Sequence, residues 1–255
     1  MSLEWFIRIA TEYWPMFLRG AGMTLLVSII STLIGSIIGL IIGVIRTIPM
    51  PERGWKRLIL KALDAVLGFY IAFFRGTPMI VQAMVVYYGS MYVYNIDMSP
   101  MFAGLFVVSI NTGAYMAETV RGGIISIDIG QTEAAKAIGM THYQTMSCVV
   151  LPQALRNIMP QIGNNLIINI KDTSVLNVIS VTELYFLSKS AAGAYYRYFE
   201  VFFITCVIYF VMTFTISRFL IWIEKKMDGP ENYSLVEYDP LADPCGPFPP
   251  KGGYK

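Results

Sequence analysis

Ionisable and amide side chains interrupt stretches of this chain that are otherwise apolar. Lys171 and Asp172 stand side by side among Ile, Leu and Val residues, Asn111 lies within a second apolar run, and Arg75 ends a third. A Lys or Asp at the centre of a membrane helix costs about 2.5–3.5 kcal/mol on insertion scales, so it normally faces a cavity or a partner. These residues therefore indicate a polar path through the protein or, for Lys171 and Asp172, an internal ion pair.

The adjacent charges at 171 and 172 also predict a local change in the helix that carries them. Neighbouring side chains point about 100° apart on an α-helix, so both face one cavity only where the helix unwinds. Thr173 and Ser174 follow directly, and their hydroxyls can bind backbone groups that such a break would free. We therefore expect Thr173 and Ser174 along the same polar path.

A second unusual stretch is polar and rich in alanine, and reads QTEAAKAIGMTHYQTMSCVVLPQALRNIMP from Gln131 to Pro160. Thr132 is a candidate N-cap for a short helix, with Glu133 in the favourable first turn. Gly139 then supplies a stop or a left-handed turn. Pro152 suits the first turn of a following helix, where its missing donor costs nothing. This pattern predicts a compact helix, turn and helix.

The composition places these features in a membrane protein. Of 255 residues, 55% are hydrophobic and 14% are charged, and the mean hydropathy is +0.56, which a soluble domain of this size does not show. The formal charge of +2 is scattered, which argues against nucleic acid as a partner. Three widely spaced cysteines and one histidine support neither a disulfide framework nor a metal site, and we expect no catalytic residues.

The chain contains about five stretches near the 20 or so residues that span a bilayer as a helix. They are Gly20–Ile45, Leu58–Tyr92, Met101–Val120, Ile158–Val178 and Phe199–Trp222. The second is too long for one span, and its residues Arg75–Pro78 predict a break or strong kink. In the first, Gly35, Gly39 and Gly43 recur every four residues, which indicates close packing against another helix. We therefore predict an all-α integral membrane protein.

Basic residues set the expected orientation. Five Lys or Arg residues lie within 46–61, just after the first span, whereas none lies between Tyr92 and Phe102. By the positive-inside rule the N-terminus is outside and the C-terminus is cytoplasmic. Residues 1–19 are amphipathic and predicted to lie in the interface, 20–227 form the membrane domain, and the Pro- and Gly-rich 228–255 form a disordered tail. We find no cleavable signal peptide, so the first span would direct insertion.

Several anchors at fixed spacing carry a resemblance to a known family. Glu133, Ala134, Ala135, Gly139, Val149, Leu151 and Pro152 match the EAA loop of binding-protein-dependent ABC importer permeases. The flanking FRGTPMIVQ, SINTGAYMAETVRGGI and NIKDTSVLNVISVTEL resemble the polar amino acid subfamily, related to histidine and glutamine permeases. The similarity covers roughly residues 20–226. Val149 stands where the motif often has Ile, and the long tail is a further departure.

The resemblance implies a type I ABC importer permease fold in a bacterial plasma membrane, with a coupling loop at about 128–152. Its EAA residues would seat in a groove of a separate ATPase subunit. The chain has no GxxxxGK[ST] motif, so it would be a transport subunit without enzymatic activity or cofactor, with ATP bound by that partner. Further expected partners are an extracellular or periplasmic binding protein and a second permease, identical or homologous. An ordinary connector is the alternative for this loop.

A polar amino acid is the substrate class that the resemblance implies. Its ammonium needs acceptors and its carboxylate needs a cation or free N–H groups, which the predicted path would provide. That path comprises Arg75, Asn111, Lys171, Asp172, Thr173 and Ser174. Structural roles are the alternatives: Arg75 as a clamp on carbonyls freed at 76–78, Asn111 as a link between helices, and Glu118 paired with Arg121 on the helix surface. A stand-alone channel or a membrane scaffold without an ATPase is the alternative function.

Overall fold

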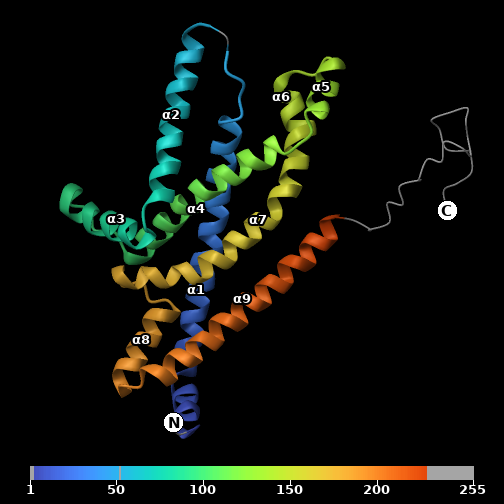
Figure 1. Cartoon of the computed structure of the whole chain (residues 1–255). Coiled ribbons are helices and arrows are strands. Elements are labelled where there is room, and N and C mark those ends of the chain that lie inside the picture. Colours follow the sequence, from blue (N-terminus) through green and yellow to red (C-terminus); the bar gives the residue numbers. More distant parts are fainter. Residues whose placement is uncertain (1–2, 52, 229–255) are drawn as a thin grey trace, which may run out of the picture.

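The computed structural model describes residues 3–51 and 53–228, and within these ranges the secondary structure is entirely helical (Figure 1). The predicted tail beyond residue 228 and Cys245 lie outside the described residues. The α-helices are α1 (Leu3–Ile45), α2 (Trp55–Gly76), α3 (Met79–Tyr94), α4 (Pro100–Ile125), α5 (Ile129–Ala137), α6 (His142–Thr145), α7 (Leu151–Asp172), α8 (Leu184–Tyr195) and α9 (Tyr198–Asp228). A π-helical turn η1 (Met146–Val150) and a 3-10 helix η2 (Thr173–Ile179) complete the order.

Helix α1 packs along α4 at very short range because glycines line the contact. A Cβ atom added at Gly35 would lie 2.6 Å from Thr112 Cβ, and one at Gly43 would lie 2.6 Å from Val120 Cβ. Such distances leave no room for a side chain, so the helices approach through bare backbone. The predicted role of the four-residue glycine spacing in helix packing is confirmed.

Within the described residues, three helices are long and apolar enough to cross a membrane, namely Glu4–Ile45, Pro100–Ile125 and Tyr198–Lys226. The other two predicted spans correspond to the α2–α3 pair and to α7 with η2, which are divided or more polar. Helix α1 continues unbroken through the boundary expected near residue 19. The interfacial position of residues 1–19, the count of five spans and the outward N-terminus stay predictions.

The predicted break between the two halves of the second span is confirmed. Helix α2 ends at Gly76, Thr77 is extended with φ −119° and ψ 144°, and α3 starts after Pro78. Proline has no backbone N–H and clashes with the preceding turn, so a helix cannot pass through it undisturbed. The result is a short stretch of non-helical backbone beside α4.

The chain also changes its winding at the end of α7. The α-helix stops at Asp172 and continues as the tighter 3-10 helix η2, which ends at Ile179 and is followed by Ser180 with φ +64°. Glu183 then begins α8: its carboxylate accepts hydrogen bonds from the backbone N–H groups of Tyr185 and Phe186 and from Tyr209 Oη of α9. This fully buried carboxylate fixes α8 against α9.

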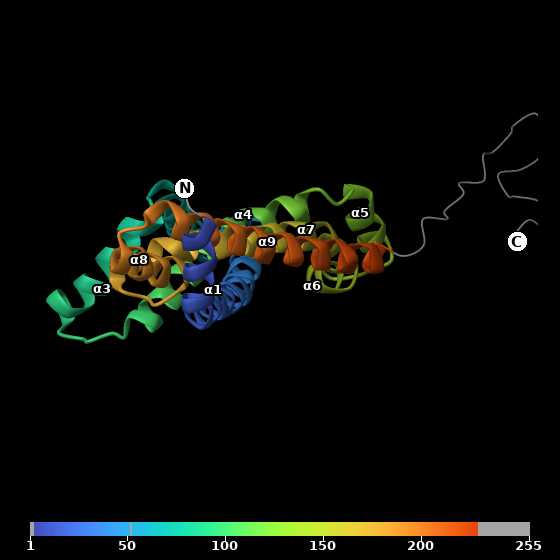
Figure 2. The same cartoon turned by 90° about the horizontal axis from the view of Figure 1, so that it is seen from below.

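At the opposite end of the molecule, α5 and α6 form a small hairpin (Figures 1 and 2). Gly139 lies between them with φ +86°, so the predicted left-handed turn is confirmed. The predicted N-cap at Thr132 is wrong: α5 begins earlier, where Asp128 Oδ1 accepts from Gly130 N at 2.6 Å. Through η1 the chain runs helically into α7, whose first turn contains Pro152 as predicted.

Candidate functional site

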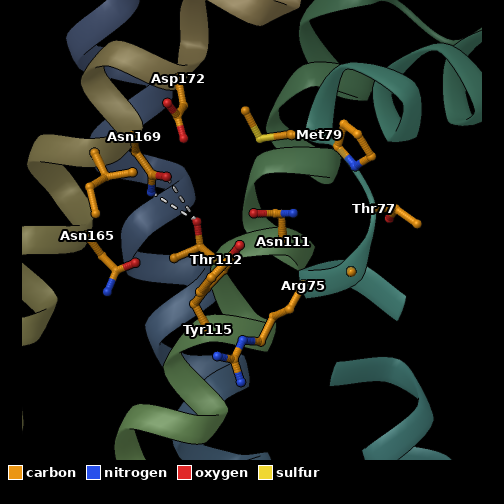
Figure 3. Close-up of a pocket in the computed structure, with 12 residues that line it drawn as sticks. Arg75, Thr77, Met79, Asn111, Thr112, Tyr115, Asn165, Asn169 and Asp172 are labelled. Atoms are coloured by element: carbon orange, nitrogen blue, oxygen red, sulfur yellow. Dashed lines mark hydrogen bonds between the residues drawn. The ribbon is translucent and has the colours of Figure 1, made fainter. Parts of the chain in front are cut away.

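A cavity of about 510 Å³ opens where the α2–α3 break faces α4 and α7 (Figure 3). The break contributes Arg75, Gly76, Thr77, Pro78 and Met79; α4 contributes Asn111, Thr112 and Tyr115; α7 contributes Asn165, Ile168, Asn169 and Asp172. The lining is therefore rich in amides, with one basic and one acidic residue. A hydrogen-bonding cavity of this kind within apolar helices suits a small polar solute.

Two side-chain amides stabilise the non-helical backbone beside this cavity. Pro78 cannot donate to the carbonyl of Phe74 four residues earlier, which would leave that oxygen without a helical partner. Gln82 Nε2 donates to Phe74 O at 3.0 Å and to Thr77 O at 2.9 Å, and Asn111 Nδ2 donates to Phe74 O at 3.1 Å. Among the described residues, Gln82 and not Arg75 donates to the Thr77 carbonyl, and Arg75 pairs with Glu118, so the structure gives no support to Arg75 as a clamp on the carbonyls of 76–78.

Asn111 joins the break to the cavity. Its Nδ2 also donates to Gln82 Oε1 at 3.0 Å, so this nitrogen is committed to the break. Its oxygen lies on the side of α7 (Figure 3) and accepts no hydrogen bond from the described part of the chain. Asn111 thus links helices and also presents a free acceptor to the cavity. The structural and the lining interpretations of this residue are compatible.

A buried polar cluster fixes the α7 wall of the cavity. Asn169 Nδ2 donates to Thr32 Oγ1 of α1 at 2.8 Å and to Thr112 Oγ1 of α4 at 3.0 Å. All three residues are at most 6% exposed. Buried amides that are fully paired hold a single orientation, so α1, α4 and α7 meet at a rigid point on one side of the cavity.

The predicted path residues divide into two groups in the structure. Arg75, Asn111 and Asp172 line the cavity. Thr173 is fully buried with Oγ1 donating to Ile170 O at 3.0 Å, and Ser174 Oγ donates to Lys171 O at 2.7 Å. Lys171, Thr173 and Ser174 are not among the lining residues.

No salt bridge joins Lys171 to Asp172 among the described residues, and both residues are exposed. The proposed internal ion pair is therefore not formed in this structure. The α-helix ends only at Asp172, so the change of winding follows the two charges instead of separating them. Asp172 faces the cavity, whereas Lys171 does not line it.

Several lining residues were missed by sequence reasoning although a helical pattern marks them. Asn165, Asn169 and Asp172 recur at spacings of four and three residues, which places them on one face of α7. Asn111 and Tyr115 share a face of α4 in the same way. Gln82, four residues after Pro78, also escaped notice. Polar residues at helical spacing in an apolar segment were the available signal.

Charged residues form a network at the Arg75 end of the cavity. Arg75 Nη1 lies 3.5 Å from Glu118 Oε2, and its guanidinium lies 5.4 Å from the Tyr115 ring centroid. Arg46 Nη1 lies 3.1 Å from Glu118 Oε1, and Arg46 Nε lies 2.9 Å from Asp64 Oδ1. The predicted Glu118–Arg121 pair is wrong, because Glu118 pairs with Arg46, just after α1, and with Arg75 of α2, which the fold brings near.

The EAA-like segment at the other end of the molecule forms an exposed surface. Within α5, Glu133 and Ala134 are exposed while Ala135 is buried. Ile138 and Tyr143, on either side of the Gly139 turn, are 80% and 79% exposed. Leu151 is half-buried and Pro152 is exposed. Large apolar side chains displayed at the tip of a hairpin are typical of a surface that another protein covers.

Comparison with known proteins identifies relatives that cover most of this chain. Residues 54–229 match the family described as "Binding-protein-dependent transport system inner membrane component". The glutamine transport system permease protein GlnP of Escherichia coli (strain K12) is 36% identical over 214 residues, which cover 84% of this chain and 93% of that protein. The probable amino-acid ABC transporter permease protein PatM of Vibrio harveyi is 36% identical over 171 residues, which cover 66% of this chain and 77% of that protein.

A solved structure shows the same arrangement of helices. It is the "Crystal structure of an amino acid ABC transporter with histidines", with a TM-score of 0.76 and 35% sequence identity. The match covers 89% of this chain and 100% of that chain. The architecture expected from the EAA segment and its flanks therefore corresponds to a fold already observed.

Proposed function

We propose a transport role on the premise that the chain belongs to the family of binding-protein-dependent transport system inner membrane components. As a member it is a multi-pass permease of the bacterial plasma membrane. We infer that it carries polar amino acids inward as the membrane subunit of an ATP-driven importer. The observation that carries this proposal is the amide-rich cavity between the α2–α3 break, α4 and α7.

The cavity offers complementary groups to both ends of an amino acid zwitterion. Asp172 and the free oxygen of Asn111 would accept from the ammonium group. The carboxylate would lie at the start of α3, where Met79 lines the cavity and the first backbone N–H groups have no helical acceptor. Broken membrane helices use their half-helix N-termini in this way for anionic groups.

Arg75 would act mainly through the charge balance of the site. It lines the cavity, yet its guanidinium pairs with Glu118 and stacks near Tyr115, pointing away from Asp172 (Figure 3). A salt-bridged guanidinium still contributes positive potential at the carboxylate end. The relatives, a glutamine permease and an amino acid transporter with histidines, support a polar amino acid as substrate.

The α5–α6 hairpin would transmit ATP-driven motion to the membrane helices. Glu133, Ala134, Ala135 and Gly139, with Leu151 and Pro152 at the base, would contact a separate ATPase subunit, and the exposed Ile138 and Tyr143 would fill apolar pockets on it. Because the chain carries no GxxxxGK[ST] motif, ATP would bind to that partner. Closure of two ATPases would shift the permease between inward- and outward-open populations.

The complete importer would contain two permease chains, two ATPases and an external binding protein. The permease pair would be two copies of this chain or this chain with a homologue. Exposed apolar residues along α2, such as Leu58, Val66 and Phe69, provide a surface that lipid or the second permease would cover.

Reconstituted uptake tests the proposed substrate cavity. The permease is placed in proteoliposomes with its ATPase and binding protein, and uptake of radiolabelled L-glutamine and L-histidine is followed with ATP inside. Asp172→Asn should lower uptake at least tenfold while ATPase copurification is unchanged. Ser174→Ala, two residues away but outside the cavity, is the matched control and should transport normally. Equal uptake by both variants, or conduction by the permease without its ATPase, would refute the proposal.

A further inference from the structure

A second cavity, of about 440 Å³, lies beside the α5–α6 hairpin. It is bounded by the end of α1 and the following residues, the end of α4, the hairpin and η1. It is separate from the amide-rich cavity, since the two share no lining residue. The features of this second cavity are independent of the proposed transport site.

The polar side of this cavity is basic. Arg46, Lys136 and His142 line it, and no Asp or Glu belongs to the lining. Lys136 and His142 are exposed, and neither forms a side-chain hydrogen bond or ion pair with the described residues. Arg46 is tied to Asp64 and Glu118 behind the wall. The unpaired charge therefore belongs to Lys136, which would attract an anion.

The other side of the cavity is apolar. Ile125 and Ile129 line it while remaining 62% and 72% exposed, and Met146 and Val150 also line it. Thr145 also lies in this wall, and its buried hydroxyl has no hydrogen-bond partner among the described residues. A small inorganic anion would leave the isoleucines in water. An amphiphile with an anionic head would cover the isoleucines and bind Lys136 at the same time.

The position along the chain fits a lipid headgroup. Arg46 follows α1, the longest apolar helix, directly, and in the predicted orientation this end faces the cytoplasm. In that orientation the cavity would lie near the anionic headgroups of the inner leaflet, and basic pockets between helices on the cytoplasmic side are known to bind such headgroups. We propose that this cavity binds the headgroup of an anionic phospholipid, with its phosphodiester at Lys136 and His142 and its glycerol and first methylenes on Ile125 and Ile129.

Such a lipid would connect the hairpin to the membrane surface. Lys136 and Ile129 belong to α5, His142 to α6 and Ile125 to α4, and Arg46 directly follows α1. One bound molecule would therefore touch each element that positions the hairpin. Its removal would leave α5 held mainly by its own packing against η1 and α6.

Native mass spectrometry of the full-length chain in detergent tests this inference. Phosphatidylglycerol and phosphatidylcholine with the same acyl chains are titrated, and bound lipid is counted. We expect phosphatidylglycerol to bind at least fivefold more tightly. Lys136→Gln should weaken it about fivefold, the effect of one basic residue at a membrane surface. Lys225→Gln removes an exposed lysine from the end of α9 and should bind like wild type.

Two further measurements distinguish lipid binding from the binding of other anions, and the contribution of the apolar wall from that of the Lys136 charge. Inorganic phosphate and glycerol 3-phosphate at millimolar concentration should not displace phosphatidylglycerol, because they cannot cover the isoleucines. Ile129→Asn should weaken the binding of phosphatidylglycerol although Lys136 is unchanged. Unchanged binding in Lys136→Gln, equal loss in Lys225→Gln, or displacement by inorganic phosphate would each overturn the inference.

Discussion

Asn111 Nδ2 donates a hydrogen bond of 3.1 Å to the carbonyl oxygen of Phe74, the carbonyl that Pro78 deprives of its helical donor. The amide on α4 thus replaces a hydrogen bond missing from α2. Its oxygen remains available on the cavity side, so the support of the break and the lining of the cavity depend on one side chain. A substitution at this position would disturb both, and Gln82 offers a cleaner test of the break alone.

Gln82→Ala should destabilise the break. The substitution removes the side-chain donor to Thr77 O and one of the two side-chain donors to Phe74 O, and losing a hydrogen bond costs about 0.5–1.5 kcal/mol. Thermal unfolding in detergent measures the change. Gln153→Ala is the control, since Gln153 is exposed and its side chain donates only to Val149 O in the preceding turn η1. Equal melting temperatures for the two variants would contradict this account of the break.

Substitution by alanine should have different effects on stability at two glycines of α1. At Gly39 a Cβ would collide with Met116 and Ala117 of α4, so Gly39→Ala should destabilise the protein by about 1–3 kcal/mol. Gly22 has nothing within 4 Å of the added Cβ, so Gly22→Ala should be neutral or stabilise by up to about 1 kcal/mol. The melting temperatures of the two variants are measured by thermal unfolding in detergent and compared. If both variants behaved alike, the α1–α4 contact would not depend on bare backbone.

Gly139→Leu should uncouple the ATPase while leaving membrane insertion intact. Gly139 has φ +86°, which a residue with Cβ adopts at a cost of about 1–2 kcal/mol, and no atom lies near its added Cβ. The effect would come from the turn, with any clash arising only against a bound partner. Copurification of the ATPase and uptake are measured. Gly122→Leu, equally uncrowded but in α4 without positive φ, is the control; normal uptake by Gly139→Leu would exclude this role.

Glu118→Gln should weaken the contacts among α1, α2 and α4. Glu118 accepts a hydrogen bond from Arg46 and forms an ion pair with Arg75. Neutralising Glu118 therefore removes a negative charge that both arginines contact. Arg121 is the residue that sequence spacing wrongly paired with Glu118. Arg121→Gln should therefore lower the melting temperature less than Glu118→Gln. Comparing the melting temperatures of the two variants shows which arginines Glu118 pairs with. A larger loss in Arg121→Gln would contradict the network.

Local backbone chemistry was the part of this fold that sequence predicted well. Pro78 forced the break, Gly139 supplied a left-handed turn, and the α1 glycines allowed close packing, because each depends on properties of the residue itself. The N-cap failed because both Thr132 and Asp128 can cap, and only the actual start of α5 distinguishes them.

The candidate site was only partly predictable. Arg75, Asn111 and Asp172 were found because polar groups are rare in apolar segments. Asn165 and Asn169 carry no charge and were overlooked, although they share a helix face with Asp172. The partners of Glu118 lie 72 and 43 positions away in the sequence, and such contacts arise only when α1, α2 and α4 meet.

Protection of a cysteine by substrate tests the central claim, that the amide-rich cavity holds the transported amino acid. Cys148, Cys206 and Cys245 are replaced by serine, and Asn165→Cys is introduced in the cavity, with Ser174→Cys outside it as control. The reconstituted importer is labelled with a membrane-impermeant maleimide in the presence and absence of saturating L-glutamine or L-histidine. We expect substrate to slow labelling of Asn165→Cys severalfold and to leave Ser174→Cys unaffected. Labelling of Asn165→Cys that neither amino acid changes, in a complex that still transports one of them, would place the substrate elsewhere.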